Sequence, residues 1–497
     1  MKLQEKYAVL CKLVPSSTQH IVARTAQTVN EVLGEFLEEI SCKYQASIGK
    51  VYEVDGILKM LGNVCEACTT ILENMKDGSA EAYTYISTLT KVFTVYKIML
   101  REDDASGKNK ELYNTEFLAV AFRTLNATIP FSGTFDCQTA VMSSINNMLI
   151  SYKSLGLQND GHFFFHNNCY YAKLILKSMR RKCSAKYLTV ASNIIYRCSA
   201  LNAKCFQALF VDVITIIVPT LAASCWMLKE QQQQGHPQKD CVGLLLALLR
   251  IVHLYGPNYL NATDTGTGVN NKKFGEIPNL LNLVSTTGVV LMEVLSLKLD
   301  LQNLIHPVKL SVVRILIDVP EHYLMFLVER KKTAHLLNLL SFESERIMVQ
   351  NKKEENDIAH NFVPILLVLL RILKIKDVTC GRLGRKQIKN YIFPPKETSD
   401  SIEKGTLQQP TPLKAQKRQS MEPTDAPKFT LRRYLIDMLL EFSASTNVIV
   451  PLGDLVYHLC DRDGDELIRR CGLGYCAGVL QRQGALGQFM KGVPSTF

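Results

Sequence analysis

The sequence lacks the segments that mark a secreted, membrane-spanning or β-rich protein. Charged residues interrupt the stretch from Met1 to Leu13, so we expect no secretory signal there. The longest uncharged apolar run, Val213 to Leu228, is shorter than a typical membrane span and contains Pro219. Convincing alternating strand patterns are absent, and glycine and proline fall mostly between helical stretches. These absences predict a soluble, cytoplasmic protein built from helices.

The sequence also lacks the glycine-rich loops of nucleotide-binding proteins and the nucleophile elbow of hydrolases. Gly472, Gly474 and Gly478 follow a helical pattern rather than a strand, and the third falls one residue late for a dinucleotide loop. Instead, Gly472 is typical of a left-handed helix cap, Gly474 of a tight turn and Gly478 of close helix packing. We therefore expect no enzymatic chemistry and no bound cofactor.

Cysteine and histidine residues do not form a strong metal motif. The fifteen cysteines are odd in number and lie mostly in apolar helical runs, which favours reduced core residues over disulfides. His162, His166 and Cys169 have plausible ligand spacing, but they lie among aromatic residues that favour packing. Cys65 and Cys68 lack a second pair suited to zinc, so they too are interpreted as core residues, and we expect no metal site.

Helical periodicity dominates the 497 residues. Residues 363–375 read as an inner helix with Pro364 in its first turn, and residues 432–442 and 448–460 read as a helix pair joined by a polar turn. The prediction is an all-α, armadillo/HEAT-like right-handed helical-repeat solenoid over residues 1–395, continued by further repeats over 429–487. A polar, proline-rich segment, 396–428, is expected to be a disordered linker or loop, and 488–497 a short tail.

One group of residues near the end of the chain carries a family resemblance. It comprises Leu459, Cys460, Ile468, Arg469, Gly472, Gly474, Ala477, Gly478, Leu480 and Gly484. Upstream, in the same order, come His306-Pro307 with Val319-Pro320, then Val363-Pro364, then residues 390–397 with their Pro-Pro pair. This order resembles the synembryn family (resistance to inhibitors of cholinesterase) over about residues 300–487.

The resemblance implies an armadillo/HEAT-like protein that binds α subunits of heterotrimeric G proteins. Members of that family bind the GDP-bound subunit, hold it nucleotide-free, promote exchange for GTP and act as folding chaperones for new subunits. The family continues into an acidic, phosphorylatable stretch, whereas this sequence stops at Phe497, so we expect binding even where exchange is inefficient. The expected protein is monomeric, binds no nucleic acid, and lies in the cytoplasm or at the cell cortex. We expect no stable insertion into a membrane, and peripheral recruitment only through the partner.

Basic residues are the partner-binding candidates within the helical region. The net charge is +11, and cations gather in two stretches with few acidic neighbours. They are Arg330, Lys331, Lys332, Arg371, Lys374, Lys376, Arg382, Arg385, Lys386 and Lys389. On a curved solenoid such residues can line an extended site for an acidic or helical partner, although a solvated face is the alternative.

Two other functions remain compatible with the sequence. The chain could be a helical-repeat scaffold or adaptor for another protein client, or a nucleic-acid-binding repeat protein favoured by its charge. Separately, Ser420 follows Lys417 and Arg418 in the polar segment, which is a pattern for a basic-directed kinase. We hypothesise that Ser420 can be phosphorylated; an unmodified solvated loop is the alternative.

Overall fold

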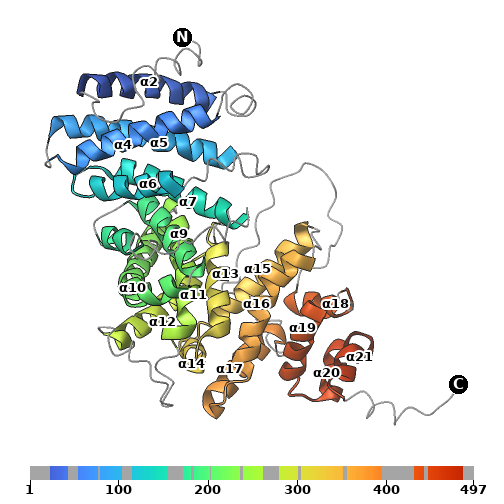
Figure 1. Cartoon of the computed structure of the whole chain (residues 1–497). Helices are drawn as coiled ribbons and strands as arrows, with labels where there is room; N and C mark the ends of the chain where they lie inside the picture. The colour runs from blue at the N-terminus through green and yellow to red at the C-terminus, as the bar shows by residue number, and fades with distance from the viewer. Residues whose placement is uncertain are drawn as a thin grey trace. The chain divides into compact units, whose positions relative to one another are not determined.

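The fold is a succession of α-helices, seen here in a computed structural model. The structure describes residues 23–42, 54–75, 79–102, 115–131, 133–154, 172–180, 184–201, 203–234, 239–260, 279–299, 304–350, 355–394, 430–441 and 446–484. Within these ranges every regular element is a helix and no strand occurs. The prediction of an all-α helical-repeat fold is confirmed (Figure 1).

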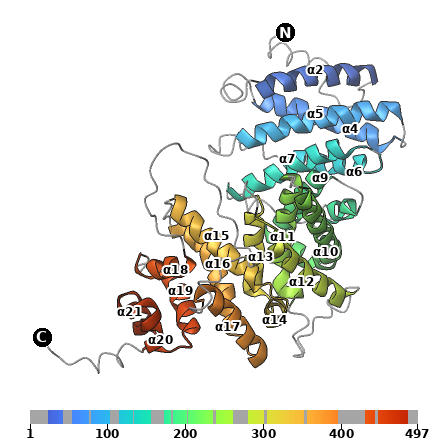
Figure 2. The same cartoon turned by 180° about the vertical axis from the view of Figure 1, so that it is seen from behind.

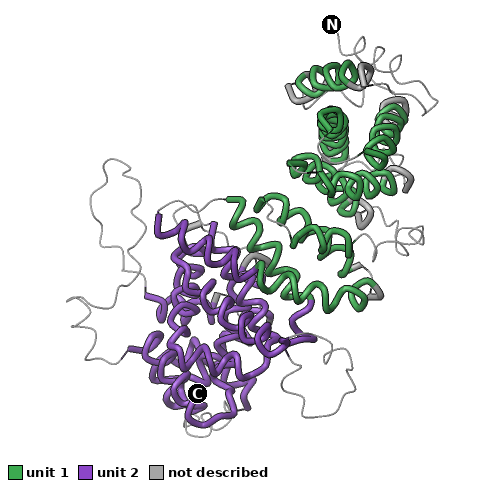
Figure 3. Tube along the Cα trace, turned by 90° about the vertical axis from the view of Figure 1, so that its left-hand side faces the viewer, with its two compact units in different colours: residues 1–220, 238–254, 276–278 green, residues 221–237, 255–275, 279–497 purple. Residues whose placement is uncertain are grey.

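The chain divides into two compact units, coloured separately in Figure 3. Unit 1 comprises residues 1–220, 238–254 and 276–278, and unit 2 comprises residues 221–237, 255–275 and 279–497. The helices of the first half are α2 (Ala23–Cys42), α4 (Val54–Glu73), α5 (Ala80–Glu102), α6 (Thr115–Thr128), α7 (Phe135–Ser154), α9 (Ala185–Leu201), α10 (Ala203–Gln233) and α11 (Lys239–Tyr259), with a further helix over 172–179. The predicted domain boundaries at residues 395, 428 and 487 lie outside the described residues.

The remaining helices belong to unit 2. They are α12 (Leu280–Ser296), α13 (His306–Asp318), α14 (Glu321–Glu329), α15 (Thr333–Gln350), α16 (Glu355–Leu373), α17 (Val378–Ile392), α18 (Leu431–Glu441), α19 (Thr446–Leu459), α20 (Gly464–Cys471) and α21 (Leu473–Arg482). Each packs on helices close to it in sequence: α13 contacts α12 and α16, α17 contacts α14 to α16, and α19 contacts α16. Figure 2 shows the same succession from behind.

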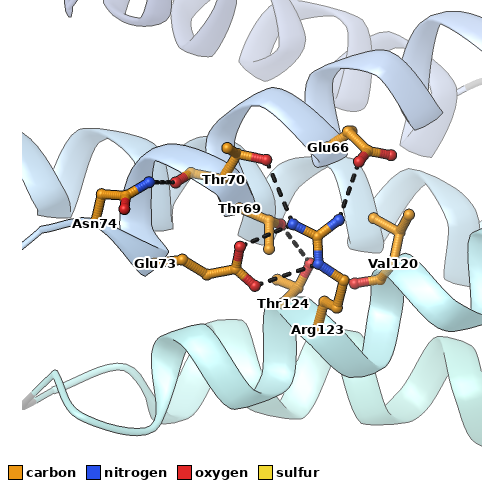
Figure 4. A network of polar contacts seen from close by, with 8 residues as sticks. All are labelled: Glu66, Thr69, Thr70, Glu73, Asn74, Val120, Arg123 and Thr124. Carbon is orange, nitrogen blue, oxygen red and sulfur yellow. Dashed lines mark hydrogen bonds and ion pairs between the residues drawn. The ribbon is translucent and has the colours of Figure 1, made fainter.

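Unit 1 is held together by apolar helix faces and by polar contacts between alternate helices. α5 packs against α2 and α7, and Ser144 of α7 donates to the carbonyl oxygen of Phe93 in α5 at 2.8 Å. On the neighbouring pair, Arg123 of α6 donates to Glu66 at 3.0 Å and to Glu73 at 2.8 Å, both in α4 (Figure 4). Because the guanidinium reaches two carboxylates two turns apart, it fixes the register of α6 on α4.

Two helices of this part of the chain are long and apolar enough to cross a membrane by length and composition alone. They are Cys205–Gln233, within α10, and Lys239–Tyr259, which is α11. More than half of each apolar window is buried within the protein, which is what the core helices of a helical-repeat fold show.

Several predicted helix boundaries are confirmed in unit 2. α13 begins at His306 with Pro307 in its first turn, where a missing backbone N–H does no harm. α14 follows Pro320 directly, and the pair predicted from residues 432–442 and 448–460 corresponds to α18 and α19. Asp377 caps α17 by accepting from the backbone N–H of Cys380 at 2.7 Å.

The predicted position of Pro364 is wrong: it lies in the middle of α16 rather than in the first turn. A proline there removes the donor that would bond to the carbonyl of His360, four residues earlier. Arg314 of α13 replaces that donor, since its Nη2 donates to the His360 carbonyl oxygen at 3.1 Å. The helix therefore continues through Pro364 because a neighbouring helix supplies the missing hydrogen bond.

The three C-terminal glycines fit their predicted roles only at Gly472. Gly472 has φ 87° and separates α20 from α21, so the expected positive φ is confirmed, although its ψ of 144° is not that of a left-handed helix. Gly474 lies inside α21 rather than in a tight turn. A Cβ at Gly478 would meet nothing within 4 Å, so the prediction of close packing there is wrong.

Candidate interaction surfaces

Arg371, predicted as a partner contact, is committed to the end of a neighbouring helix. Its Nη1 donates to the carbonyl oxygens of Leu316 at 2.8 Å and Ile317 at 2.7 Å, and its Nη2 donates to that of Val319 at 2.7 Å. Burial lowers the pKa of the guanidinium, with Asp318 among the groups opposing that shift. Arg371 thus satisfies carbonyl groups that the last turn of α13 leaves without donors.

Three other candidates are paired with acidic groups. Lys389 lies 2.6 Å and Arg385 3.5 Å from the carboxylate of Asp461, in the turn between α19 and α20. Lys332 donates to the hydroxyl of Ser296 at 2.8 Å and lies 3.8 Å from Glu293. These side chains link α17 to the last helices, and the start of α15 to α12.

The remaining candidates are exposed. Arg330 lies over the ring of Phe326, with its Cζ 5.1 Å from the ring centroid. Of these exposed candidates, Lys331, Lys374, Lys376, Arg382 and Lys386 form no ion pair with the described residues. Arg382 and Lys386 lie one turn apart on the solvent face of α17, so this face is the basic surface available to a partner.

A second surface, which the sequence analysis did not single out, surrounds the single tryptophan of the chain. Trp226 of α10 is 57% exposed and Met227 beside it is 46% exposed. The ammonium of Lys229 lies 4.9 Å from the centroid of the indole ring and 2.7 Å from Oε2 of Glu293 in α12. A cation over its face and an ion pair beside it hold the indole at the surface rather than in the core.

The apolar part of this surface continues onto α12. Lys229 contacts Glu293, and Gln232 donates to the carbonyl oxygen of Lys298 at 2.8 Å, so the last part of α10 is joined to the C-terminal end of α12 and the residues just after it. Val289 of α12, one turn before Glu293 and therefore on the same side of that helix, is 46% exposed. We call Trp226, Met227 and Val289, with the flanking Lys229 and Glu293, the tryptophan surface.

The sequence contained one signal for this surface. Trp226 lies three residues before Lys229, and residues three apart share a helix face, so this spacing could have indicated that the indole lies beside a solvent-exposed charge. Exposed tryptophan with adjacent apolar area is typical of the anchor residues of protein interfaces.

A buried lysine lies near the same ion pairs. Lys309 of α13 is only 5% exposed, and burial lowers its pKa to about 8. The pKa of His335 falls to about 4, because the imidazole is buried and because Lys309 and Lys332 are both positively charged nearby. Lys309 has no carboxylate partner among the described residues, so no opposite charge offsets the burial that disfavours its protonated form.

Candidate metal ligands do not come together in the described residues, where no group of three or more His, Cys, Asp or Glu side chains could hold an ion. Cys65 and Cys68 are buried core residues, as predicted, and burial raises the pKa of both thiols. Such thiols are poor nucleophiles. His162, His166, Cys169 and the proposed phosphorylation site Ser420 lie outside the described residues.

The fold and these two surfaces define a helical-repeat protein that offers a basic helix face and an exposed aromatic patch. No protein-family model and no curated protein matches the chain. A solved structure described as a circular tandem repeat protein with novel repeat topology and enhanced subunit contact surfaces is similar over 98% of this chain and 98% of that chain. The sequence identity is 9% and the TM-score is 0.28.

Proposed function

We propose that this chain is a guanine-nucleotide exchange factor and folding chaperone for α subunits of heterotrimeric G proteins. The observation that carries the proposal is the ordered set of residues from His306 to Gly484 that resembles the synembryn family. The all-α helical-repeat fold is compatible with that resemblance. The proposed location is the cytoplasm or the cell cortex, and the proposed active form is a monomer.

The proposed mechanism is differential binding of the partner. The chain binds the nucleotide-free α subunit more tightly than the GDP-bound one, so that binding lowers the affinity of the partner for GDP by the same factor. GTP binding reverses this preference and releases the subunit. All phosphate contacts then belong to the partner, and this chain contributes only a binding surface.

The tryptophan surface is the proposed anchor for the α subunit. Trp226, Met227 and Val289 offer exposed apolar area that a partner can desolvate, and anchors of this kind dominate the energy of protein interfaces. Lys229 of this surface and Lys332 next to it both lie beside Glu293, so two cations face one carboxylate, which suits a partner segment with apolar and acidic residues.

The test is GDP release from purified α subunits of several classes, with and without this protein, together with pull-down of the nucleotide-free complex. Accelerated release and a complex dissolved by GTP are expected. Trp226→Ala should weaken the complex at least tenfold, because truncating an interface tryptophan typically costs about 2 kcal/mol or more. Tyr83→Ala is the matched control, since Tyr83 is an aromatic residue of α5 that is 46% exposed.

Two results would redirect the proposal. Binding without accelerated release would leave the chaperone activity alone. If no α subunit of any class binds, the chain is better explained as a helical-repeat scaffold for another protein client.

A further inference from the structure

The solvent face of α17 combines cations with apolar side chains in its first half. Val378, Arg382, Lys386 and Asn390 follow one another at intervals of four residues, and Leu383 lies beside them. Val378 is 70% exposed and Leu383 is 39% exposed. α17 contains no acidic residue, so this face carries positive charge without an internal counter-charge.

The opposite face of α17 is fixed firmly to the rest of unit 2. A Cβ at Gly381 would lie 2.8 Å from the carbonyl oxygen of Ile375, and one at Gly384 would lie 2.7 Å from Cγ2 of Ile372. The absence of side chains therefore lets the helix lie close against its neighbours. The exposed face is presented by a rigid helix, and residues along it keep their spacing.

Positive charge also surrounds this helix. Gln387 donates to the carbonyl oxygen of Val328 at 3.1 Å, which brings the end of α14 beside the second half of α17. The cations of α17 and of the turns that adjoin α14 and α17 are Arg330, Lys331, Lys332, Lys374, Lys376, Arg382, Arg385, Lys386 and Lys389. The carboxylates of the same region are Glu321, Glu329, Asp377 and Asp461.

Three of these carboxylates are already engaged within the protein, since Glu321 accepts from the backbone N–H of Lys376 at 2.8 Å. Asp461 is shared by Arg385 and Lys389, and Asp377 caps α17. A surplus of cations therefore faces solvent around α17, with Arg382 and Lys386 at the centre of its exposed face.

From this arrangement we propose that the α17 face, defined by Val378, Arg382, Leu383 and Lys386, binds the surface of a bilayer that contains anionic phospholipids. Lysine and arginine reach the headgroups through long apolar stems, while Val378 and Leu383 enter the boundary of the acyl region. Cations beside apolar groups on one exposed helix are typical of protein segments that bind anionic bilayers. This binding is independent of the proposed exchange activity.

The same observations favour a bilayer over other acidic partners. The exposed apolar groups lie along one helix and alternate with charge, which suits a planar surface better than a single peptide anchor. Single-stranded nucleic acid would stack its bases on aromatic rings, and none of the four residues that define this face is aromatic.

The experiment is co-sedimentation of the full chain with two kinds of vesicle at two salt concentrations. One kind contains phosphatidylcholine alone, and the other contains phosphatidylcholine with about 30% phosphatidylserine. We expect binding only to the phosphatidylserine vesicles and weaker binding at higher salt. Arg382→Glu combined with Lys386→Glu should reduce binding at least tenfold, since two favourable charges become unfavourable. Val378→Ser combined with Leu383→Ser should reduce it several-fold while leaving the salt dependence in place.

The matched control reverses an equivalent pair in unit 1. Lys173 and Lys177 are exposed, lie four residues apart on the helix over 172–179, and undergo the same change of charge when both are replaced by Glu. That variant should bind vesicles nearly as the parent protein does. Circular dichroism melting establishes that each variant is folded.

Three outcomes would overturn the proposal. The first is a parent protein that does not bind phosphatidylserine vesicles. The second is an equal loss of binding in both charge-reversal variants, which would indicate an effect of net charge alone. The third is an α17 variant that keeps vesicle binding but loses α-subunit binding, which would make this face a protein contact. The vesicle assay contains no α subunit, so its failure leaves the exchange proposal to its own test.

Discussion

Arg371 of α16 donates from Nη1 to the carbonyl oxygen of Leu316 at 2.8 Å, and its three hydrogen bonds to this segment join α16 to the end of α13. We predict that Arg371→Met lowers the free energy of unfolding by about 2–4 kcal/mol, because charge-assisted bonds are lost and partly buried carbonyl groups remain without donors. Urea denaturation measures the change. Lys374→Met, at an exposed position nearby, should change it by less than about 0.5 kcal/mol. Equal effects of the two substitutions would contradict this role.

Because Arg314 donates to the His360 carbonyl in place of residue 364, we predict that substitutions of Arg314 and Pro364 have non-additive effects on the free energy of unfolding. Arg314→Met should destabilise the protein by about 1 kcal/mol, because it leaves that carbonyl without a donor. When Pro364 is first replaced by Ala, the new N–H can bond to His360 and the effect of Arg314→Met should shrink. A double-mutant cycle in urea measures this coupling; additive effects would show that the arginine does not replace the missing donor.

We predict that glycine-to-alanine substitutions at two positions of the C-terminal half change the stability of the protein in opposite directions. Gly384→Ala should destabilise the protein by about 1–3 kcal/mol, because the new Cβ would lie 2.7 Å from Ile372 and 3.2 Å from Val328. Gly478→Ala should stabilise it by up to about 1 kcal/mol, because the site is helical and open. Thermal melts of both variants provide the comparison, and destabilisation by Gly478→Ala would indicate a contact absent from the described fold.

We predict that the stability difference between the parent protein and a Lys309→Met variant depends on pH. Its pKa is about 8 in the folded protein against 10.5 in the unfolded chain, so the unfolded state binds more protons between these values. This group alone therefore makes stability rise as pH increases from about 8 to 10.5, and below pH 8 its burial costs up to about 3 kcal/mol. Lys309→Met should be more stable than the parent at pH 7, and the gain should shrink at pH 9.5. Urea unfolding at both pH values measures it, and a pH-independent difference would contradict this account.

Local signals in the sequence predicted the parts of the fold that local chemistry controls. His306-Pro307 marks the start of α13, because proline is tolerated in a first helical turn. The same rule wrongly placed Pro364 in the first turn of a helix. Pro364 lies in the middle of α16, where Arg314 of another helix supplies the donor that the proline lacks. Sequence spacing alone could not reveal that contact.

The candidate surfaces were predictable to a similar extent. The basic character of α17 is visible in the sequence. The hydrogen bonds from Arg371 to backbone carbonyl groups are not, because every residue has a backbone acceptor and the sequence does not indicate which ones come near the guanidinium. Trp226 lies in a run that reads as core throughout, and its exposure depends on how α10 packs against α12.

The central claim is that the tryptophan surface receives a G-protein α subunit, and a single label tests it. Because Trp226 is the only tryptophan, a chain grown with 5-fluorotryptophan gives one fluorine resonance, which can be followed while an unlabelled GDP-bound α subunit is added. We predict that this resonance shifts and broadens as the complex forms and returns when GTP is added. A complex that forms while the resonance stays unchanged would place the partner elsewhere on the chain, and the claim would be wrong.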